Sequence, residues 1–333
     1  MIASILWTLF HIFIFPGFLF MLIIGLLLAG IDRKVVARMQ KRVGPPIRQP
    51  WYDFLKLWGK ENIIPDAANR TAYIAAPIAG LVALIFTGLF LFSAFLSPIA
   101  GFTSIFSSNA DLIIILYLLT IPGVCIIVGG AASGNPFAGV GLSREMVAML
   151  GYELPLVMVL LTIAKKTGEG AMNFSLAGIA AWNSAHTAFA EHWALIPAAI
   201  AMLLVIPAEV GTNPFDVAEA ETEICEGPLV EYSGKPLAVF KLNTAFKMFI
   251  MTSLFTFLFF GGVGMGINTG ITAVNVLINA VILVVIDILV TIVCITTANA
   301  VCARLKVEHL FKFYWTVVAG LALISLVLVW IGL

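Results

Sequence analysis

The stretch VNVLINAVILVVIDILVTIVCITTANA, from Val274 to Ala300, carries only one charged side chain, that of Asp287. A helix rises about 1.5 Å per residue, so about 20 consecutive apolar residues are enough to cross the hydrocarbon core of a bilayer. Strands and surface helices rarely need such a long apolar run. The stretch therefore predicts a membrane span, and the rest of the chain should have the character of a membrane protein.

The composition agrees with a bilayer environment. Hydrophobic residues make up 61% of the 333 residues and charged residues 11%, whereas soluble domains are about half apolar and about a quarter charged. This excludes a water-soluble globular protein of this size. The 18 basic and 18 acidic residues balance, so no overall positive charge points to nucleic acid as a partner.

Seven further apolar runs have the length of a span, which gives eight in all. We therefore predict an all-α, polytopic membrane protein with eight transmembrane helices and amphipathic surface helices on the cytoplasmic side, forming one integral membrane domain over residues 1–333. The predicted spans are Ile5–Ile31, Tyr73–Leu96, Leu112–Ala132, Met146–Ala164, Trp193–Ala208, Val239–Val263, Val274–Ala300 and Phe311–Leu333.

The basic residues gather on one side of these spans. If both termini lie outside the cell, the inner connections and their flanks hold sixteen of the eighteen Lys and Arg residues, and only Lys165 and Lys166 fall outside. Basic loops are retained in the cytoplasm during insertion. The sequence therefore predicts a multi-pass plasma-membrane protein whose long basic and acidic loops are cytoplasmic.

The first inner connection, residues 32–72, is predicted to form two amphipathic helices separated by Gly44-Pro45-Pro46, because proline ends helices. Basic helices that carry tryptophan lie in the membrane interface. The segment then either anchors the protein to lipid or docks a soluble partner. The apolar stripes are Val35, Val36, Met39 and Val43 in the first helix and Trp51, Phe54, Leu55 and Trp58 in the second. The candidate docking residues are Arg33, Lys34, Arg38, Lys41, Arg42, Gln49, Asp53, Lys56, Lys60 and Glu61.

The third inner connection, residues 209–238, is a candidate coupling loop because it is unusually acidic. Asp216 and Glu219 have the spacing of a capping box, and Gly227-Pro228 is a stop signal, so a short helix is predicted from Val217 to Glu226. Glu219, Glu223 and Glu226 would share one face of that helix, where like charges repel. The seven carboxylates of the connection are Glu209, Asp216, Glu219, Glu221, Glu223, Glu226 and Glu231.

Two arrangements would relieve this repulsion: basic partners from the first inner connection, or protonation of some of the acids. A solvated acidic face is the plain alternative. Apolar residues such as Phe215 and Ile224 interrupt the acids, which favours a partly buried set. Neighbouring buried carboxylates raise one another's pKa and titrate as a coupled set, which suits them to relaying protons.

Four ionisable residues lie inside or at the ends of predicted spans: Glu145, Glu153, Lys247 and Asp287. A charge in the bilayer is costly, so each is a candidate for a functional role. Glu145 and Glu153 can both face the protein interior, although an ion pair with Arg144 would also account for Glu145. For Asp287 the alternative to ion conduction is a protonated acid that is hydrogen-bonded to a neighbouring helix.

The four cysteines, Cys125, Cys225, Cys294 and Cys302, form no CxxC pair and lie in no zinc-like spacing with histidine. This pattern predicts neither a metal site nor a disulfide framework. We therefore expect no cofactor in this chain.

Three groups of residues, in chain order, resemble one family: the H subunit of respiratory complex I and the membrane anchor (M-type) subunits of energy-converting group 4 membrane-bound [NiFe] hydrogenases. The resemblance covers nearly the whole chain, and the acidic loop is its most specific part. The first group is Asp32-Arg33-Lys34, Met39-Gln40, Gly44-Pro45, Gln49-Pro50, Asp53, Lys56-Leu57 and Lys60-Glu61; the second is Arg144 with Tyr152-Glu153; the third is Pro214-Phe215-Asp216, Glu219, Glu221, Glu223 and Glu231-Tyr232-Ser233-Gly234.

The resemblance implies a non-redox membrane subunit of a multi-subunit oxidoreductase that couples electron transfer to proton or sodium translocation. The implied partners on the cytoplasmic face are [NiFe] large-subunit-like and iron–sulfur small-subunit-like proteins, which would hold a NiFe centre and [4Fe–4S] clusters. Ferredoxin would supply electrons through them, and antiporter-like subunits would lie beside the chain in the lipid bilayer. The residues implied in coupling are those of the acidic loop together with Glu145, Glu153, Lys247 and Asp287.

Two departures favour the hydrogenase type over the quinone type. The segment between Gly44-Pro45 and Gln49 is shorter than in the quinone enzymes, and Val210-Gly211-Thr212-Asn213 follows Glu209 where those enzymes carry an Asn-Arg pair. The alternatives are the quinone-chamber H subunit of complex I, and the same anchor in a sulfane-sulfur-reducing or formate hydrogenlyase complex. Two alternatives belong to other functional classes: a free-standing cation transporter and a purely structural anchor.

Overall fold

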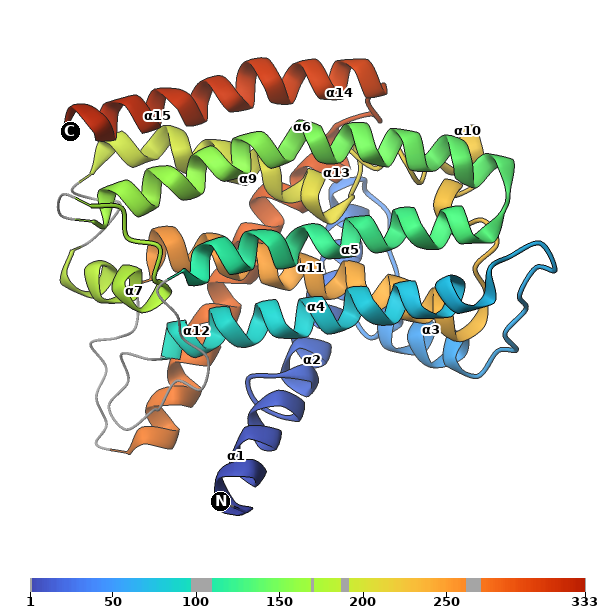
Figure 1. Ribbon diagram of the computed structural model, residues 1–333, viewed down its shortest axis with the longest axis horizontal. Helices are drawn as coiled ribbons and strands as arrows, with labels where there is room; N and C mark the ends of the chain where they lie inside the picture. The colour runs from blue at the N-terminus through green and yellow to red at the C-terminus, as the bar shows by residue number, and fades with distance from the viewer. Residues whose placement is uncertain (1, 97–109, 169–170, 187–191, 262–270, 333) are drawn as a thin grey trace.

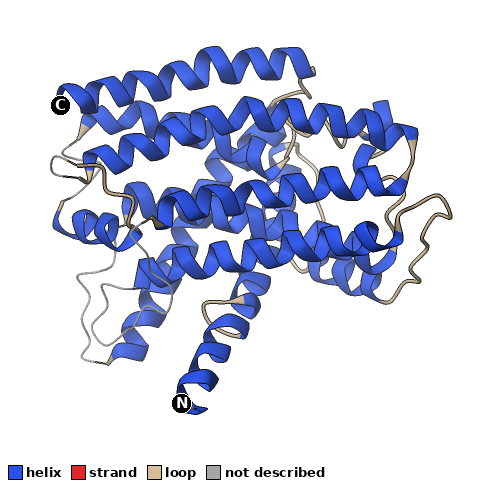
Figure 2. Ribbon diagram, in the orientation of Figure 1, coloured by secondary structure: helices blue, strands red, loops and turns tan. Residues whose placement is uncertain are grey.

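The computed structural model describes residues 2–96, 110–168, 171–186, 192–261 and 271–332, and within these ranges it contains helices and no strands (Figure 2). The predicted all-α fold is therefore confirmed. The α-helices are α1 (Ile2–Phe13), α2 (Phe18–Met39), α3 (Gln49–Trp58), α4 (Arg70–Leu96), α5 (Asp111–Ser133), α6 (Pro136–Lys166), α7 (Leu176–Ala185), α9 (Ile196–Val210), α10 (Glu221–Ile224), α11 (Gly234–Phe260), α12 (Thr272–Thr291), α13 (Thr297–Val301), α14 (Val307–Phe313) and α15 (Ala319–Ile331).

Among the residues that the structure describes, eight helical segments are long and apolar enough to cross a membrane, which confirms the predicted number of spans. Two of them continue through a π-helical turn: α12 passes through η3 (Ile292–Thr296) into α13, and α14 passes through η4 (Tyr314–Val318) into α15. The protein is therefore a multi-pass membrane protein. The predicted span ends Val263 and Leu333 lie outside the described residues. The segments are Leu6–Met39, Arg70–Leu96, Asp111–Ser133, Pro136–Lys166, Trp193–Val210, Gly234–Phe260, Thr272–Val301 and Val307–Ile331.

Helix α11 forms the centre of the bundle. Nearly all of its residues are buried, and it packs against α2, α4, α9 and α12. Its phenylalanines Phe246, Phe249 and Phe257 are completely shielded from solvent. In Figure 1, α4, α5 and α6 run beside one another, with α10 near one end of the bundle and the C-terminus of α15 at the other. A polar side chain at a buried position of α11, such as that of Lys247, must therefore find its partners inside the protein.

The first span differs from the prediction, Ile5–Ile31, in two ways: it is interrupted within these bounds, and it extends beyond their C-terminal end. Helix α1 ends at Phe13 and α2 begins at Phe18, because Pro16 has no N–H for a continuous helix. At the C-terminal end α2 continues to Met39, since no glycine or proline interrupts it before Gly44-Pro45.

The prediction of a separate first surface helix is therefore wrong. Val35, Val36 and Met39 belong to α2, whereas Val43 lies beyond its end and is 75% exposed. The run of charges at Asp32-Arg33-Lys34 does not stop the helix, since these residue types are compatible with helical structure.

The second predicted surface helix is confirmed as α3. Pro50 lies in its first turn, a position where proline is compatible with a helix. Trp51 and Phe54 pack against the core, and α3 contacts both α2 and α11. Leu55 and Trp58 remain exposed, so α3 keeps an apolar face that points away from the bundle.

Candidate functional site

A buried ion pair joins α9 to α11. The Nζ atom of Lys247 lies 2.8 Å from Oε1 of Glu209, and both side chains are shielded, with 8% and 3% of their surface exposed. Glu209 is the penultimate residue of α9, whose end is capped by Gly211 with a left-handed backbone (φ 75°). In a low-dielectric interior each of these charges depends on the other, because an unpaired buried charge costs several kcal/mol.

A small cavity of about 40 Å³, with several polar side chains in its wall, lies beside this pair. Glu145 and Tyr152 of α6, Glu219 of the acidic loop, and Asn243 of α11 contribute to its wall. The space is enough for about one to three water molecules. Oδ1 of Asn243 is buried without a hydrogen-bond partner among the described residues, although its amide nitrogen donates to the carbonyl of Pro77 at 3.1 Å.

The cavity combines one cation with several acids. Lys247 compensates Glu209, while Glu145 and Glu219 line the same space. Neighbouring carboxyl groups that share a site cannot all ionise easily. The arrangement can therefore hold a proton and exchange it along a short polar path.

The acidic loop does not form the predicted helix Val217–Glu226. Only α10, Glu221–Ile224, is helical, because Cys225 and Glu226 both have left-handed backbone (φ 53° and 68°). Gly227 follows with φ 49°, so three consecutive residues turn the chain away from the helix. Glu219, Glu223 and Glu226 consequently share no helical face.

Asp216 is not the predicted helix cap. Its carboxylate accepts two hydrogen bonds from Arg304, from Nε at 2.9 Å and from Nη2 at 2.6 Å. Arg304 lies in the connection between α13 and α14. This bidentate pair fastens the start of the acidic loop to the last inner connection, and planar pairs of this kind are among the strongest charge-assisted hydrogen bonds.

Two other acids of the loop, Glu223 and Glu231, also find partners outside the first inner connection, so the prediction that basic residues of that connection compensate the acids is corrected. Glu223 pairs with Arg144 at 2.6 Å, so Arg144 does not neutralise Glu145 as the alternative required. Glu231 accepts a hydrogen bond from Asn135 at 2.5 Å. Glu221 lies at the start of α10, and Glu226 is half-buried near Glu219.

Glu219 has no ion-pair partner among the described residues. Burial, followed by the charges of Glu145, Asp216 and Glu226, raises the pKa of its carboxyl from 4.5 to about 7, while Lys241 acts in the opposite direction. Of the acids in the loop, Glu219 is therefore the one that the environment places between its protonated and ionised forms near neutral pH.

This shift predicts a pH-dependent stability. The folded protein binds the Glu219 proton more tightly than the unfolded chain does, so stability falls as the pH rises from about 4.5 to about 7. The loss is at most about 3 kcal/mol. The unfolding temperatures of the native protein and of Glu219→Gln should be similar at pH 5. At pH 8 they should differ, with the variant the more stable. Equal pH profiles for the two proteins would contradict the assignment.

Glu153 and Asp287 lie outside the cavity. Glu153 is half-buried on α6 and does not line it, whereas Glu145 and Tyr152, seven residues apart and thus on one helix face, both do. Asp287 is fully buried on α12 and accepts hydrogen bonds from Ser253 at 2.5 Å and Thr256 at 2.6 Å on α11. Asp287 therefore has hydrogen bonds to a neighbouring helix, as expected if it is a protonated acid with a structural role.

The first inner connection is tied to the acidic loop. Asn62 accepts a hydrogen bond from the backbone N–H of Lys235 at 2.9 Å, and the Ser233 hydroxyl lies against the backbone of Ile63. Close by, the rings of Tyr73 and Tyr232 stack with centroids 4.1 Å apart. The two connections that the sequence singled out therefore form one continuous surface.

The candidate docking residues divide into paired and exposed groups. Asp53 accepts hydrogen bonds from Arg33 at 2.8 Å and Gln49 at 2.9 Å. Burial acts to raise the pKa of Asp53, but these hydrogen bonds and the charges of Arg33 and Lys241 outweigh it and lower the pKa. Lys34 donates to the carbonyl of Val43. The exposed residues are Arg38, Lys41, Arg42, Lys56, Lys60 and Glu61.

Sequence reasoning missed three members of this arrangement. Arg304 was counted only as an inner basic residue, Asn243 was not considered, and Asp32, which accepts a hydrogen bond from Thr296 at 2.7 Å, was considered only as part of a motif. A polar residue inside an otherwise apolar span was the available signal for Asn243. The Arg304 pairing bridges 88 positions, and no local pattern marks it.

The chain is similar to several known proteins over most of its length. Residues 12–330 match the family model described as NADH dehydrogenase. Hydrogenase-4 component C of Escherichia coli (strain K12) is 35% identical over 234 residues, 70% of each chain. The H subunit of the NADH-quinone oxidoreductase of Geobacillus thermodenitrificans (strain NG80-2) is 32% identical, and the match covers 97% of this chain and 94% of that one. A chain in the structure of the membrane-bound sulfane sulfur reductase, an archaeal respiratory membrane complex, matches with a TM-score of 0.79 and 31% identity, covering 93% of this chain and 96% of that one.

Proposed function

The chain belongs to the NADH dehydrogenase family, and we propose that it is the membrane anchor and coupling subunit of a ferredoxin-oxidising, hydrogen-evolving complex of the [NiFe] hydrogenase type. Its relatives include a component of hydrogenase-4 and the H subunit of an NADH-quinone oxidoreductase, which supports a membrane role in an oxidoreductase complex. The observation that carries the proposal is the buried Lys247–Glu209 pair beside the cavity that Glu219 lines.

The proposed topology places this cavity on the cytoplasmic side of the membrane. The concentration of basic residues in the inner connections supports that orientation. The acidic loop and the first inner connection would then together face the peripheral arm. Arg38, Lys41 and Arg42 are among the exposed cations of this surface that are available to an acidic partner.

The chain's own contribution would be electrostatic. When an electron reaches a cluster in the partner above, the added negative charge favours proton uptake by the acids beneath it. Glu219 is poised for that uptake because its pKa is raised to about 7. Protonation of Glu219 changes the field at Glu145 and at the Lys247–Glu209 pair, and this change would be passed on toward Glu153, Asp287 and antiporter-like neighbours.

The redox chemistry would belong to the partners. [4Fe–4S] clusters and a NiFe centre would transfer the electrons and reduce protons, and this chain would hold no redox centre. Its residues would hold and release protons at the Glu219 carboxyl, orient the loop through Asp216–Arg304, and keep the Lys247–Glu209 pair shielded.

A matched pair of substitutions tests the coupling role. In the complete complex, reconstituted in vesicles, Glu219→Gln should lower the number of ions moved per electron, because glutamine cannot take up a proton. Glu223→Gln removes an acid from the same loop, but Glu223 is 56% exposed and does not line the cavity, so its coupling ratio should stay near the native value. Ion uptake and hydrogen evolution would be measured on the same vesicles. An unchanged ratio in Glu219→Gln, with the complex assembled, would reject the relay.

The principal alternative is a quinone-chamber subunit. The near full-length match to the H subunit of an NADH-quinone oxidoreductase supports it. The purified complex distinguishes the two functions directly: the proposal expects ferredoxin-dependent hydrogen evolution that added quinone does not divert. Electron transfer to quinone in place of hydrogen evolution would establish the alternative. Release of sulfide would indicate that the chain anchors a sulfane-sulfur-reducing complex, and oxidation of formate would indicate a formate hydrogenlyase complex.

A further inference from the structure

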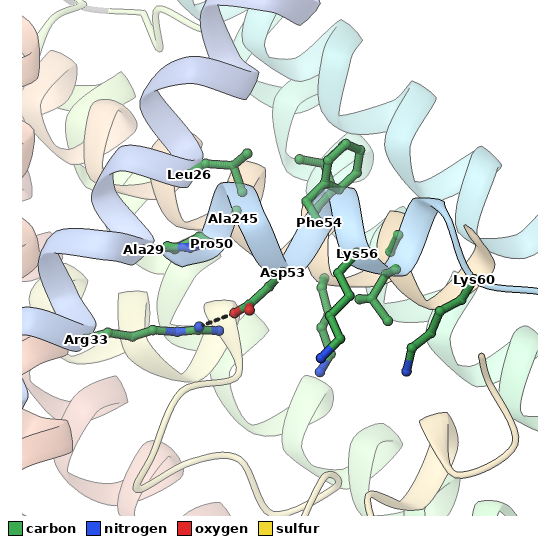
Figure 3. A pocket seen from close by; sticks show the side chains of 13 residues that line it. Leu26, Ala29, Arg33, Pro50, Asp53, Phe54, Lys56, Lys60 and Ala245 are labelled. Atoms are coloured by element: carbon green, nitrogen blue, oxygen red, sulfur yellow. Dashed lines mark hydrogen bonds and ion pairs between the residues drawn. The ribbon is translucent and has the colours of Figure 1, made fainter. Parts of the chain in front are cut away.

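We propose that a second pocket, between α2, α3 and α11, binds one anionic phospholipid, with the lipid phosphate held by lysines and an acyl chain against an apolar wall. The pocket has a volume of about 250 Å³ (Figure 3). It is separate from the cavity beside the Lys247–Glu209 pair. Lys241 and Ala245 of α11 line the second pocket, whereas Asn243 and Lys247 line that cavity. Residues two apart on a helix point about 200° apart, so the two sites lie on opposite faces of α11.

One side of the pocket is strongly cationic. Arg33, Lys56, Lys60 and Lys241 line it together with a single carboxylate, Asp53. Arg33 is committed to Asp53 at 2.8 Å. Among the described residues none forms a salt bridge with the three lysines. The pocket therefore carries an excess of about three positive charges, which an anionic group can compensate.

The opposite side is apolar. Figure 3 shows Leu26 and Phe54 on the side of the pocket away from the ends of Lys56 and Lys60. Along α2 the lining changes from Leu26 to Arg33 over seven residues, a rise of about 10 Å. The polarity thus changes along a membrane-spanning helix, as the bilayer itself changes from hydrocarbon to headgroup.

This division of polarity identifies the ligand as an amphiphile. A free phosphate would use the lysines and leave the apolar wall without a partner, and a neutral lipid would leave the lysines uncompensated. Leu55 and Trp58, exposed on α3 beside the pocket, have the character of side chains that lie at a membrane interface. An anionic phospholipid satisfies both ends, and basic pockets between membrane helices bind such headgroups.

Binding would fasten α3 to the bundle. Helix α3 contacts α2 and α11, and all three helices contribute to the pocket. A lipid shared among them would stabilise the surface that the first inner connection presents, independently of which redox partner docks there. The inference therefore stands or falls separately from the proposed hydrogenase-type function.

The test compares two triple variants of the complete complex. Lys56→Gln/Lys60→Gln/Lys241→Gln removes the pocket lysines, and Arg70→Gln/Lys306→Gln/Lys312→Gln removes three exposed basic residues that lie outside the pocket. After purification in mild detergent, native mass spectrometry would measure bound lipid. Three headgroup contacts correspond to about a hundredfold in affinity, so the pocket variant should lose the anionic lipid while the control retains it as the native complex does.

Added ligands identify the source of the anion. Phosphatidylglycerol should raise the unfolding temperature of the delipidated native and control complexes but not that of the pocket variant, while phosphatidylcholine and inorganic phosphate should have little effect. An equal effect of inorganic phosphate would show a free-anion site, and an equal effect of phosphatidylcholine would show nonspecific lipid binding; either overturns the proposal. Loss of the peripheral arm from the pocket variant with unchanged lipid content would show that the lysines dock an acidic protein, which also overturns it.

A milder variant guards against misfolding. If the triple pocket variant does not accumulate, Lys60→Gln alone, at an exposed position just beyond α3, should weaken lipid retention about fivefold. Native lipid retention in that variant would contradict the proposal.

Discussion

Replacing Lys247 with Met should lower the stability of the protein by about 3–5 kcal/mol, because Glu209 is left as an uncompensated charge in a buried site. The Glu209 side chain is 3% exposed and lies near the end of α9, so it is largely cut off from bulk water. The expected result is a large fall in the amount of folded protein in the membrane and a lower unfolding temperature in detergent.

Two controls isolate the buried charge as the cause. In the double variant Lys247→Met/Glu209→Gln both charges are absent, and most of the lost stability should return, since replacing a buried pair as a unit is often nearly neutral. Lys312→Met removes an exposed lysine from a different membrane span and should change little. A single Lys247→Met variant as stable as the native protein would show that Glu209 does not depend on the pair.

Replacing Gly227 with Ala should displace the acidic loop. Gly227 has φ 49°, in the left-handed region, and a Cβ atom there would overlap the backbone carbonyl oxygen of Ala218. The positive φ alone costs about 1–2 kcal/mol for a residue with a side chain. The overlap adds to this cost because the carbonyl oxygen of Ala218 belongs to the backbone and cannot rotate away as a flexible side chain could. The loop amides between α9 and α11 should then exchange hydrogen more than about tenfold faster than in the native protein.

Gly211→Ala provides the matched control. Gly211 also has a left-handed backbone (φ 75°), but a Cβ atom there meets nothing within 4 Å. This variant carries the conformational cost alone, about 1–2 kcal/mol or roughly a tenfold change. Exchange in Gly227→Ala that does not exceed exchange in Gly211→Ala would mean that the close approach to Ala218 does not hold the loop in place.

The spans could be predicted from the sequence because their signal is local. A run such as Val274–Ala300 must satisfy its backbone hydrogen bonds within the bilayer, so length and apolar character alone indicate a helix. The boundary of the first span was misplaced because the change from apolar to charged residues at Ile31 was treated as the end of the helix. Charged residues such as Arg33 continue a helix readily, and α2 extends to Met39.

The conformation of the acidic loop could not be predicted in the same way. Asp216 and Glu219 have the local spacing of a capping box, but Asp216 instead binds Arg304, 88 residues away. Cys225 and Glu226 adopt left-handed backbone, which residues with side chains rarely do and which no local pattern announces. Tertiary ion pairs, rather than helix propensity, determine the shape of this segment.

The site residues were selected by charge and by family resemblance, and the structure now separates their surroundings. Glu145, Glu209, Glu219 and Lys247 meet at one cavity, whereas Glu223 pairs at the surface with Arg144. The sequence left an ion pair with Arg144 open as an explanation of Glu145, because the two residues are neighbours in the chain. Adjacent residues on a helix point about 100° apart, and Arg144 reaches the acidic loop instead.

The most direct test of the coupling role is an infrared difference spectrum of the complete complex, recorded between its oxidised and ferredoxin-reduced forms. We predict that reduction adds a carbonyl band of a protonated carboxylic acid, that this band is absent from Glu219→Gln, and that Glu223→Gln retains it. A reduction spectrum that is the same in the native complex and in Glu219→Gln would show that the proton does not go to Glu219 when the electron arrives.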